Sequence, residues 1–196
     1  MEKTGSVILQ QIRNNNKRPL LIAIDGRCAA GKTTLAAWLQ KETGCNVIHM
    51  DHFFLRREQR NNRRLQEPGG NVDYERFLTE VMTPLSRGQA FSYRPFDCKT
   101  MAFASPILIE PGDLSIVEGS YCCHPVLWDF YDLRVYLHVE PEEQLRRIER
   151  RNGKKALSLF QERWIPLEEK YFSACRIRER CDLVFAEEGT ERNGTP

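Results

Sequence analysis

The stretch LIAIDGRCAAGKTTLAAWL (residues 21–39) determines how the rest of this chain is interpreted. Residues 20–25 are an apolar run typical of a buried strand, and residues 33–43, which end at Gly44, are typical of a helix. Between them, residues 26–33 fit the pattern G-x-x-x-x-G-K-[ST] in full. Glycines let such a loop curl until its backbone N–H groups point at phosphate oxygens, and the helix N-terminus adds partial positive charge. The stretch therefore predicts a phosphate-binding loop, which we call the phosphate loop (residues 26–33).

The side chains at the end of this loop indicate a nucleoside triphosphate with magnesium. Lys32 is expected to reach the β- and γ-phosphates, and the Thr33 hydroxyl is expected to ligate Mg²⁺. A chance glycine turn before a helix is the alternative, which the complete motif between strand and helix disfavours. The residues that we expect to bind the nucleotide are Gly26, Cys28, Ala29, Ala30, Gly31, Lys32, Thr33 and Thr34.

Composition predicts one soluble globular domain over residues 1–196, since 41% of the residues are hydrophobic and 29% are charged. The net charge of +2 favours neither a nucleic acid nor a membrane as partner, and we expect neither. Seven cysteines without a C-x-x-C pair fit reduced thiols in the cytoplasm, and the consecutive residues 122–124 (CCH) are poorly arranged for a metal. Assembly as a homo-oligomer stays open.

Strands that alternate with helices predict a three-layer α/β P-loop fold, in which a five-stranded, mostly parallel sheet has helices on both faces. Residues 91–97 and 104–113 resemble the two arms of a small antiparallel excursion over about 90–112, and residues 141–156 form the expected helical lid. The polar tail 187–196 is expected to be frayed. The expected strands are 20–25, 45–51, 114–119, 133–139 and 182–186, and the expected helices are 4–14, 33–43, 74–85, 141–151 and 157–180.

Two carboxylates end strands that should lie beside the phosphate loop. Functional groups of an open parallel sheet come from the carboxyl ends of its strands, so Asp51 and Glu118 are both expected to face the same crevice. Asp51 is our candidate general base and metal contact, and Glu118 our candidate ligand of Mg²⁺ or of its waters. Helix capping or a solvated turn is the alternative for each. His52 is a rival base, although strand alternation would point it away.

Four arginines follow one another in RRIERR (146–151). Arg147 and Arg151 share one helix face and Arg146 and Arg150 a neighbouring one, so one pair can reach the phosphates while the other meets solvent or nearby glutamates. A lid that carries arginines would exclude water and neutralise charge on a transferred group. The pattern does not decide which pair faces inward, and an outer helix laced with salt bridges is the alternative.

These residues together resemble the uridine kinase family, within the group that includes phosphoribulokinase and nicotinamide riboside kinase. The match runs in order along most of the chain. The matching segments are IDGRCAAGKTTLA, HMDHFF, GGNVDYERF, YRPFD, IVEGSY and VEPEEQLRRIERR.

The resemblance implies ATP- and Mg²⁺-dependent phosphorylation of a small acceptor with a hydroxyl group. It carries Lys32 and Thr33 over to triphosphate and metal binding, and Asp51 to the general base. Arg147 and Arg151 become lid residues, completing with Lys32 and Asp51 the expected catalytic set. The metal set is Thr33, Asp51 and Glu118, and the residues expected to contact the acceptor are Asp51, Phe53, Asp73, Phe96 and Glu118.

Departures from the family pattern leave the acceptor open. After YRPFD the chain reads CKTMAF, where uridine kinases carry a histidine- and arginine-containing segment that recognises the nucleoside, and Phe96 replaces a tyrosine. A nucleoside, a vitamin-type molecule and a sugar phosphate are all retained as acceptors, and a nucleotide-switched binding module is retained as a non-catalytic alternative. Five arginines could bind a phosphorylated acceptor or form a basic flap without a ligand: Arg56, Arg57, Arg60, Arg63 and Arg64.

Aromatic residues late in the chain are expected to pack in the core. Trp164, Leu167, Tyr171 and Phe172 recur at three- and four-residue spacings, as in a stripe that packs against a neighbouring helix. The aromatic residues of segment 128–131 are expected to be core as well.

Overall fold

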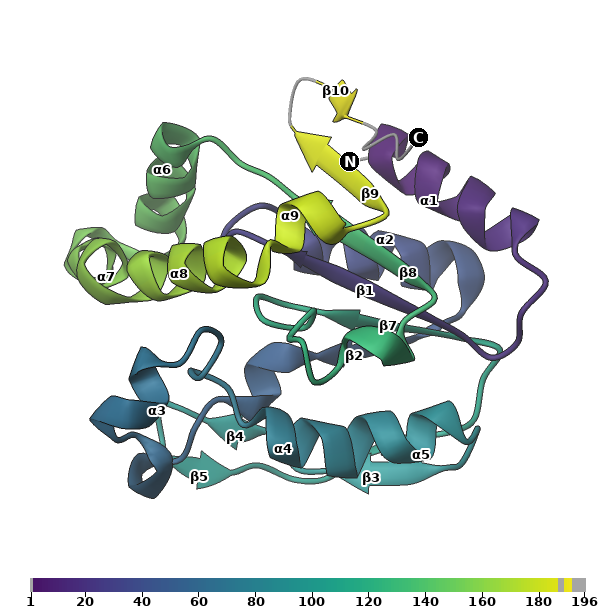
Figure 1. Ribbon diagram of the computed structural model, residues 1–196, viewed down its shortest axis with the longest axis horizontal. Helices are drawn as coiled ribbons and strands as arrows, with labels where there is room; N and C mark the ends of the chain where they lie inside the picture. Colours follow the sequence, from purple (N-terminus) through teal and green to yellow (C-terminus); the bar gives the residue numbers. More distant parts are fainter. Residues whose placement is uncertain (1, 187–188, 192–196) are drawn as a thin grey trace.

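The parallel strands predicted from the sequence form the centre of the protein (Figure 1). The computed structural model describes residues 2–186 and 189–191, and its main sheet has the order β10–β9–β8–β1–β7–β2. Five of these strands are parallel, as expected. Their bounds are β1 (Leu20–Gly26), β2 (Asn46–His49), β7 (Leu114–Glu118), β8 (Leu133–Leu137) and β9 (Leu183–Ala186).

A sixth strand corrects the expectation for the tail. β10 (Gly189–Glu191) pairs antiparallel with β9, so this part of the polar segment is ordered as an edge strand. The polar composition of residues 187–196 predicts a frayed end, but natural edge strands commonly carry charged side chains, so polarity does not exclude pairing with β9. The rest of that predicted tail, residues 187–188 and 192–196, lies outside the described residues.

Both faces of the sheet are covered, which is why its strands are continuous apolar runs rather than alternating ones. Leu21 and Ala23 of β1 belong to one core, and Ile22 and Ile24 to the other. Helices α1 (Glu2–Asn14) and α2 (Lys32–Thr43) cover the second core, and Figure 1 shows α4 and α5 on the opposite side of the sheet. The helical segment there is continuous over α4 (Tyr74–Phe77), a π-helical turn η3 (Leu78–Met82) and α5 (Thr83–Ser86).

The excursion between α5 and β7 has the predicted antiparallel pairing. β3 (Phe91–Tyr93) pairs with β6 (Ile107–Ile109), and β4 (Phe96–Asp97) pairs with β5 (Ala102–Phe103). The segment between β2 and α4 borders the excursion and carries three short helical turns. These are η1 (Met50–Phe53), η2 (Arg57–Gln59) and α3 (Asn62–Gln66).

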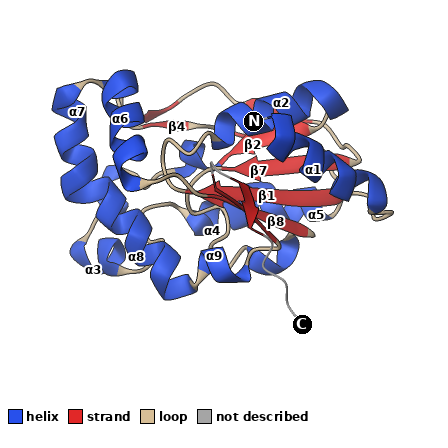
Figure 2. Cartoon of the chain, turned by 90° about the horizontal axis from the view of Figure 1, so that it is seen from above, coloured by secondary structure: helices blue, strands red, loops and turns tan. Residues whose placement is uncertain are grey.

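Helices α6, α7 and α8 gather with α3 at one end of the sheet (Figure 2). The helix predicted over 157–180 is interrupted at Arg176, whose left-handed φ of 50° ends one helix and starts the next. None of the described helices is both long and apolar enough to cross a bilayer. The helices of this part of the chain are α6 (Pro141–Asn152), α7 (Lys154–Leu159), a π-helical turn η5 (Phe160–Trp164), α8 (Ile165–Cys175) and α9 (Ile177–Arg180). A further helical turn, η4 (Trp128–Phe130), lies earlier, between β7 and β8.

Strand register sets which residues meet at the carboxyl edge of the sheet. Ile24 is paired with Glu118 across β1 and β7, and His49 is paired with Glu118 across β2 and β7. The phosphate loop, the turn after β2 and the loop after β7 therefore open at the same edge. A Cβ on Gly26, which has a φ of 137°, would lie 2.1 Å from the carbonyl oxygen of Leu137, so only glycine lets the loop leave the sheet here.

Candidate active site

The phosphate loop presents a buried ammonium beside an uncapped helix N-terminus. The Lys32 side chain is only 8% exposed, and its Nζ donates to the carbonyl oxygens of Gly26 at 2.7 Å and Arg27 at 2.8 Å. Gly31 is the N-cap of α2, with a left-handed φ of 93° and no side-chain cap. The first N–H groups of a helix have no partner within it, so they are available to an anion. The loop is therefore built to hold phosphate.

Oxygen atoms suited to a divalent cation lie next to this loop. The Thr33 hydroxyl donates to Glu118 Oε1 at 3.0 Å, and His49 Nδ1 lies 2.5 Å from the same oxygen. The hydrogen bond with Glu118 raises the pKa of His49. A hydroxyl and carboxylates are the hard donors that Mg²⁺ prefers, so this donor set fits magnesium.

Asp51 lies in the turn η1 immediately after β2, and not within the strand as expected. Its side chain is exposed to the cleft, yet the protein around it is dense enough that desolvation raises its pKa, while Lys32 opposes that rise. Gly119, with a φ of 132°, lets this turn approach the end of β7: a Cβ there would lie 2.9 Å from Met50 Cβ and 3.5 Å from Asp51 Oδ1. A carboxyl with a raised pKa in a cleft is suited to accept a proton.

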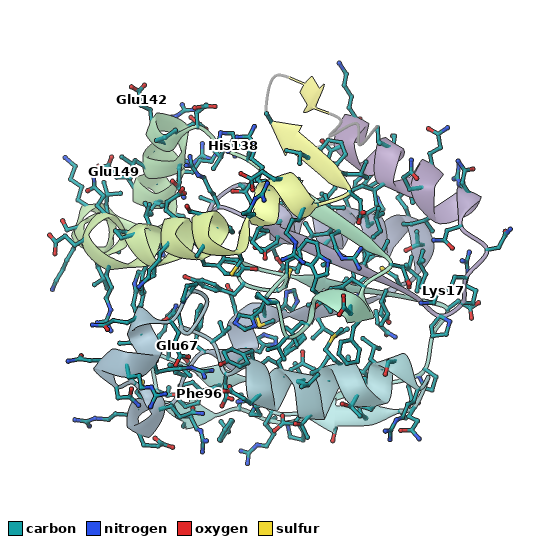
Figure 3. The ribbon with its side chains drawn as sticks, viewed as in Figure 1. Lys17, Glu67, Phe96, His138, Glu142 and Glu149 are labelled. Carbon is teal, nitrogen blue, oxygen red and sulfur yellow. The ribbon has the colours of Figure 1, made fainter. Side chains whose placement is uncertain are left out.

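The arginines of α6 divide differently from the two predicted pairs. Arg147, Arg150 and Arg151 all line the cleft. Arg146 is 73% exposed and pairs with Glu143, which Arg147 also contacts at 2.6 Å. Arg147 Nη1 also donates to the Ala29 carbonyl of the phosphate loop at 3.2 Å, so α6 lies directly against that loop. Glu142 points outward from α6 (Figure 3). Three of the four arginines of α6 therefore line the cleft.

One cleft of about 1050 Å³ is lined by most of these groups. Its lining includes Lys32, Thr33, Asp51 and Glu118, which we call the floor, and Arg147, Arg150 and Arg151 of α6. Aromatic rings from separate segments of the chain complete the walls. They are Phe54 after η1, Tyr121 after β7, and Phe160 and Trp164 in η5. Such a cleft holds a charged ligand at one place and an apolar body at another.

Comparison with known proteins identifies the family. A family model described as an AAA domain matches residues 22–164, more than half of the chain. A curated uridine kinase from Ureaplasma parvum serovar 3 is 30% identical over 142 residues, covering 68% of this chain and 69% of that protein. The chain belongs to the uridine kinase-like family. The uridine kinase of Ureaplasma urealyticum serovar 10 is 28% identical over 142 residues, with the same coverage.

Solved structures show the same fold. The structure of a possible uridine kinase from Bacillus stearothermophilus superposes with a TM-score of 0.71 at 21% identity, covering 94% of this chain and 100% of that one. The five-stranded parallel sheet with helices on both faces is thus the P-loop fold. As a member of the uridine kinase-like family, the chain has a kinase-like function, that of a nucleotide-binding phosphotransferase.

The residues expected to bind the nucleotide in this kinase-like chain fall into two groups. Cys28, Ala29, Gly31, Lys32, Thr33 and Thr34 line the cleft. Gly26 and Ala30 are buried and support the loop from behind. His52, the rival base, does not line the large cleft: its Nδ1 lies 3.1 Å from the Tyr93 hydroxyl, and burial lowers its pKa to about 4.

Three residues expected to contact an acceptor lie outside the lining of the cleft. Phe53 is fully buried in the core. Asp73 is 4% exposed and caps α4 by accepting the Arg76 N–H at 3.1 Å. Phe96 lies on the side formed by β4 and β5 (Figure 3), where it borders a smaller hollow that Asp51 also borders. Asp51 and Glu118 are the members of that set that line the large cleft.

The five arginines after Asp51 have separate roles. Arg64 is structural, because its guanidinium forms a double hydrogen bond with Glu75 at 2.6 Å and lies 4.0 Å from the centre of the Tyr74 ring. Arg60 lines the cleft. Arg57 and Arg63 are exposed, and Arg56 Nη1 lies 3.3 Å from Glu58 Oε1. The cluster is therefore not one phosphate-binding surface.

Two residues that line the cleft are not predicted to do so from the sequence. Trp164 was expected in the core, yet it is half-buried and lines the cleft, whereas Tyr171 and Phe172 are core as predicted. Spacing along a helix cannot separate a core face from a cleft wall. Glu168 is 5% exposed and lines the cleft, and its sequence context, LEEKY, gave no signal.

A second cluster of potential ligands does not suit a metal. Ligand atoms of Asp25, Cys122 and Cys123 lie within 4.8 Å of one another, all buried. The Asp25 oxygens already accept four hydrogen bonds, from three backbone N–H groups and the Tyr171 hydroxyl. Burial raises the pKa of the Cys122 thiol to about 12, which keeps it protonated, whereas metals bind the thiolate.

Proposed function

We propose that this protein is an ATP- and Mg²⁺-dependent kinase that transfers the γ-phosphoryl group to a hydroxyl of a nucleoside or similar metabolite. The observation that carries the proposal is the meeting of Lys32, Asp51 and the Thr33–Glu118 pair in one cleft with three arginines of α6. A phosphate site, a base and a cationic lid are the parts that phosphoryl transfer to an alcohol requires.

Asp51 is the proposed general base. Its raised pKa keeps it a better proton acceptor than an ordinary aspartate, while Lys32 and Arg151 favour its ionised form. An acceptor hydroxyl within hydrogen-bonding distance would pass its proton to this carboxylate as the oxygen attacks phosphorus. Such a base typically contributes about 10²–10⁴-fold to the rate.

Lys32 and the arginines of α6 bind the triphosphate and neutralise charge on the transferred group. Lys32 Nζ now donates to two loop carbonyls, and small rotations of its side chain would turn it toward a phosphate oxygen. Arg147, Arg150 and Arg151 face the same space from the lid. Because α6 lies on the loop, these cations also reduce the access of water that would hydrolyse the nucleotide.

Thr33, Glu118 and Asp51 are the residues that would hold Mg²⁺. When bound, the ion neutralises phosphate charge and helps to orient the triphosphate. Glu118 Oε1 is already held by Thr33 and His49, so this carboxylate is positioned in advance.

The acceptor is proposed to lie between Asp51 and the aromatic walls. Phe54 and Tyr121 border the floor, and Arg60 supplies a cation at the rim. A ring-bearing acceptor such as a nucleoside or a vitamin-type molecule fits the aromatic walls, while Arg60 keeps a sugar phosphate as the second candidate. The seven free cysteines support a reducing compartment such as the cytoplasm.

The decisive experiment measures acceptor-dependent release of ADP from ATP and Mg²⁺ across a panel of nucleosides, vitamins and sugar phosphates. We expect at least one acceptor to stimulate release strongly. If no acceptor does so while ATP binds, the kinase proposal is wrong and the nucleotide-switched module is favoured.

Asp51→Asn distinguishes these two functions in the same assay. A kinase loses about 10²–10⁴-fold in kcat with little change in ATP affinity, because the base acts on the acceptor. A binding module would be indifferent to the change. Asp97→Asn is the matched control, since Asp97 borders only the smaller hollow and should retain normal transfer.

A further inference from the structure

Glu168 is a buried carboxyl that touches the phosphate loop, and the proposed reaction gives it no role. It lies on α8 and is 5% exposed. Its Oε2 accepts the backbone N–H of Cys28 at 3.0 Å. That N–H belongs to the loop whose amides otherwise point at an anion. A carboxylate at this position would be repelled by a phosphate bound at the loop.

The other oxygen of Glu168 connects to the lysine of the loop through Ser120. Glu168 Oε1 accepts the Ser120 hydroxyl at 2.6 Å, and Lys32 Nζ lies 3.2 Å from the same hydroxyl oxygen. Ser120 Oγ is also 3.2 Å from the carbonyl oxygen of Gly26. The hydroxyl can therefore donate either to Glu168 or to Gly26 without moving its oxygen.

This second acceptor lets the network exist in two protonation states. When Glu168 is ionised, it accepts both the Cys28 N–H and the Ser120 O–H. When Glu168 is protonated, its carbonyl oxygen still accepts the Cys28 N–H, its own O–H donates to Ser120, and Ser120 donates to Gly26. Every buried polar atom keeps a partner in both states, so the change does not leave an unsatisfied group.

Electrostatics couples the choice between these states to the nucleotide. Burial raises the pKa of Glu168, and the nearby charge of Lys32 opposes that rise. A triphosphate adds negative charge beside the loop and draws the Lys32 charge toward itself, and both changes disfavour the ionised carboxylate. The groups that face Glu168 are Cys28, Lys32, Ser120, Tyr121 and, farther away on β8, Tyr136.

We propose that Glu168 is a positioning residue for the phosphate loop that takes up one proton from solvent when the triphosphate binds. The inference rests on the proposed function, since it requires that the cleft binds a nucleoside triphosphate. In the free protein the ionised carboxylate of Glu168 holds the loop, and in the nucleotide complex its neutral carboxyl holds the loop. Nucleotide affinity then falls as pH rises, by up to tenfold per pH unit.

The test is isothermal titration calorimetry of the full chain with a magnesium-bound, non-hydrolysable ATP analogue. Titrations at about pH 8 in two buffers with different ionisation enthalpies give the number of protons taken up. Glu168→Gln is the central variant, because its amide reproduces the hydrogen bonds of the protonated form. We expect wild type to take up close to one proton more than this variant, and the variant's affinity to be nearly independent of pH.

Glu169→Gln is the matched control. Glu169 is the next residue on the same helix, is 42% exposed and pairs with Arg27 at 2.7 Å, so its loss removes a charge near the loop but not from the network. We expect this control to take up as many protons as wild type. Equal uptake by wild type and Glu168→Gln would overturn the inference, and a lack of analogue binding by all three proteins would overturn the proposed function itself.

A second measurement does not depend on how well the variant folds. Infrared difference spectra of wild type, recorded as the analogue binds, should lose carboxylate absorption and gain the C=O band of a protonated carboxyl. Absence of that band in a complex shown to form would equally refute proton uptake by Glu168.

Discussion

Removing the hydroxyl of Tyr171 tests the buried connection between α8 and the strand that leads into the phosphate loop. Tyr171 is fully buried, and its hydroxyl donates to Asp25 Oδ2 at 2.8 Å. Tyr171→Phe keeps the ring and removes only this donor. A hydrogen bond to a charged group contributes about 1.5–3 kcal/mol, so we expect the free energy of unfolding to fall by about 2 kcal/mol where Asp25 is ionised.

The effect should depend on pH, because burial raises the pKa of Asp25 from its ordinary 3.8 to about 6. A carboxyl with a raised pKa binds its proton more tightly in the folded state. The raised pKa of Asp25 therefore adds about 3 kcal/mol to the free energy of unfolding below about pH 4. This contribution is lost as the pH rises through about 6. The hydroxyl stabilises chiefly the ionised form, so Tyr171→Phe should cost about 2 kcal/mol at pH 8 and about 1 kcal/mol at pH 5.

Urea denaturation at the two pH values measures both differences, and thermal melting should show a decrease of about 4–8 °C at the higher pH. Tyr131→Phe is the matched control: Tyr131 is 2% exposed, and its hydroxyl has no hydrogen-bond partner among the described residues. That change should be neutral or slightly stabilising. Equal destabilisation by the two variants, or a Tyr171→Phe effect that does not change with pH, would refute the reasoning.

Three further predictions concern the cleft. Gly119→Ala places a side chain at a φ of 132° against the turn that carries the proposed base, so kcat should fall by about 10²-fold. The assay is ADP release, and an unchanged kcat would contradict the close packing. Lys32→Met should weaken triphosphate binding by about 10- to 100-fold in calorimetry, with circular dichroism confirming an intact fold. Arg147→Ala should lower kcat by about 10²-fold, whereas Arg146→Ala, on the solvent side of α6, should stay within about twofold of wild type. Equal losses in the two arginine variants would exclude the assigned orientation.

The phosphate loop and the parallel sheet could be predicted because their signals are local. The glycine loop between a strand and a helix is one contiguous motif, and buried parallel strands are continuous apolar runs. Glu118 was placed correctly at the edge of the sheet because strand ends in such a sheet meet there. Asp51 lies at the same edge, as predicted, although it is in a turn rather than in the strand.

The walls of the cleft could not be predicted because tertiary packing decides them. Phe53 and Phe54 are neighbours in one aromatic pair, yet the turn η1 directs Phe53 into the core while Phe54 lines the cleft. Trp164 belongs to a helical stripe whose spacing is identical for a core face and a cleft wall. Glu168 is buried by segments about 50 and 140 residues away in the sequence, and no pattern near it reports that burial.

Hydrogen bonds on α6 and on α8 restrict where the cleft can open. Gln144 Nε2 on α6 donates to the Cys28 carbonyl at 3.2 Å, and α8 is fastened to the loop and to β1 through Glu168 and Tyr171. Only the stretch between them, residues 153–163, is largely exposed and begins at a glycine with a φ of 80°. We therefore expect any opening of the cleft to displace this short arm more than the hydrogen-bonded helices on either side of it.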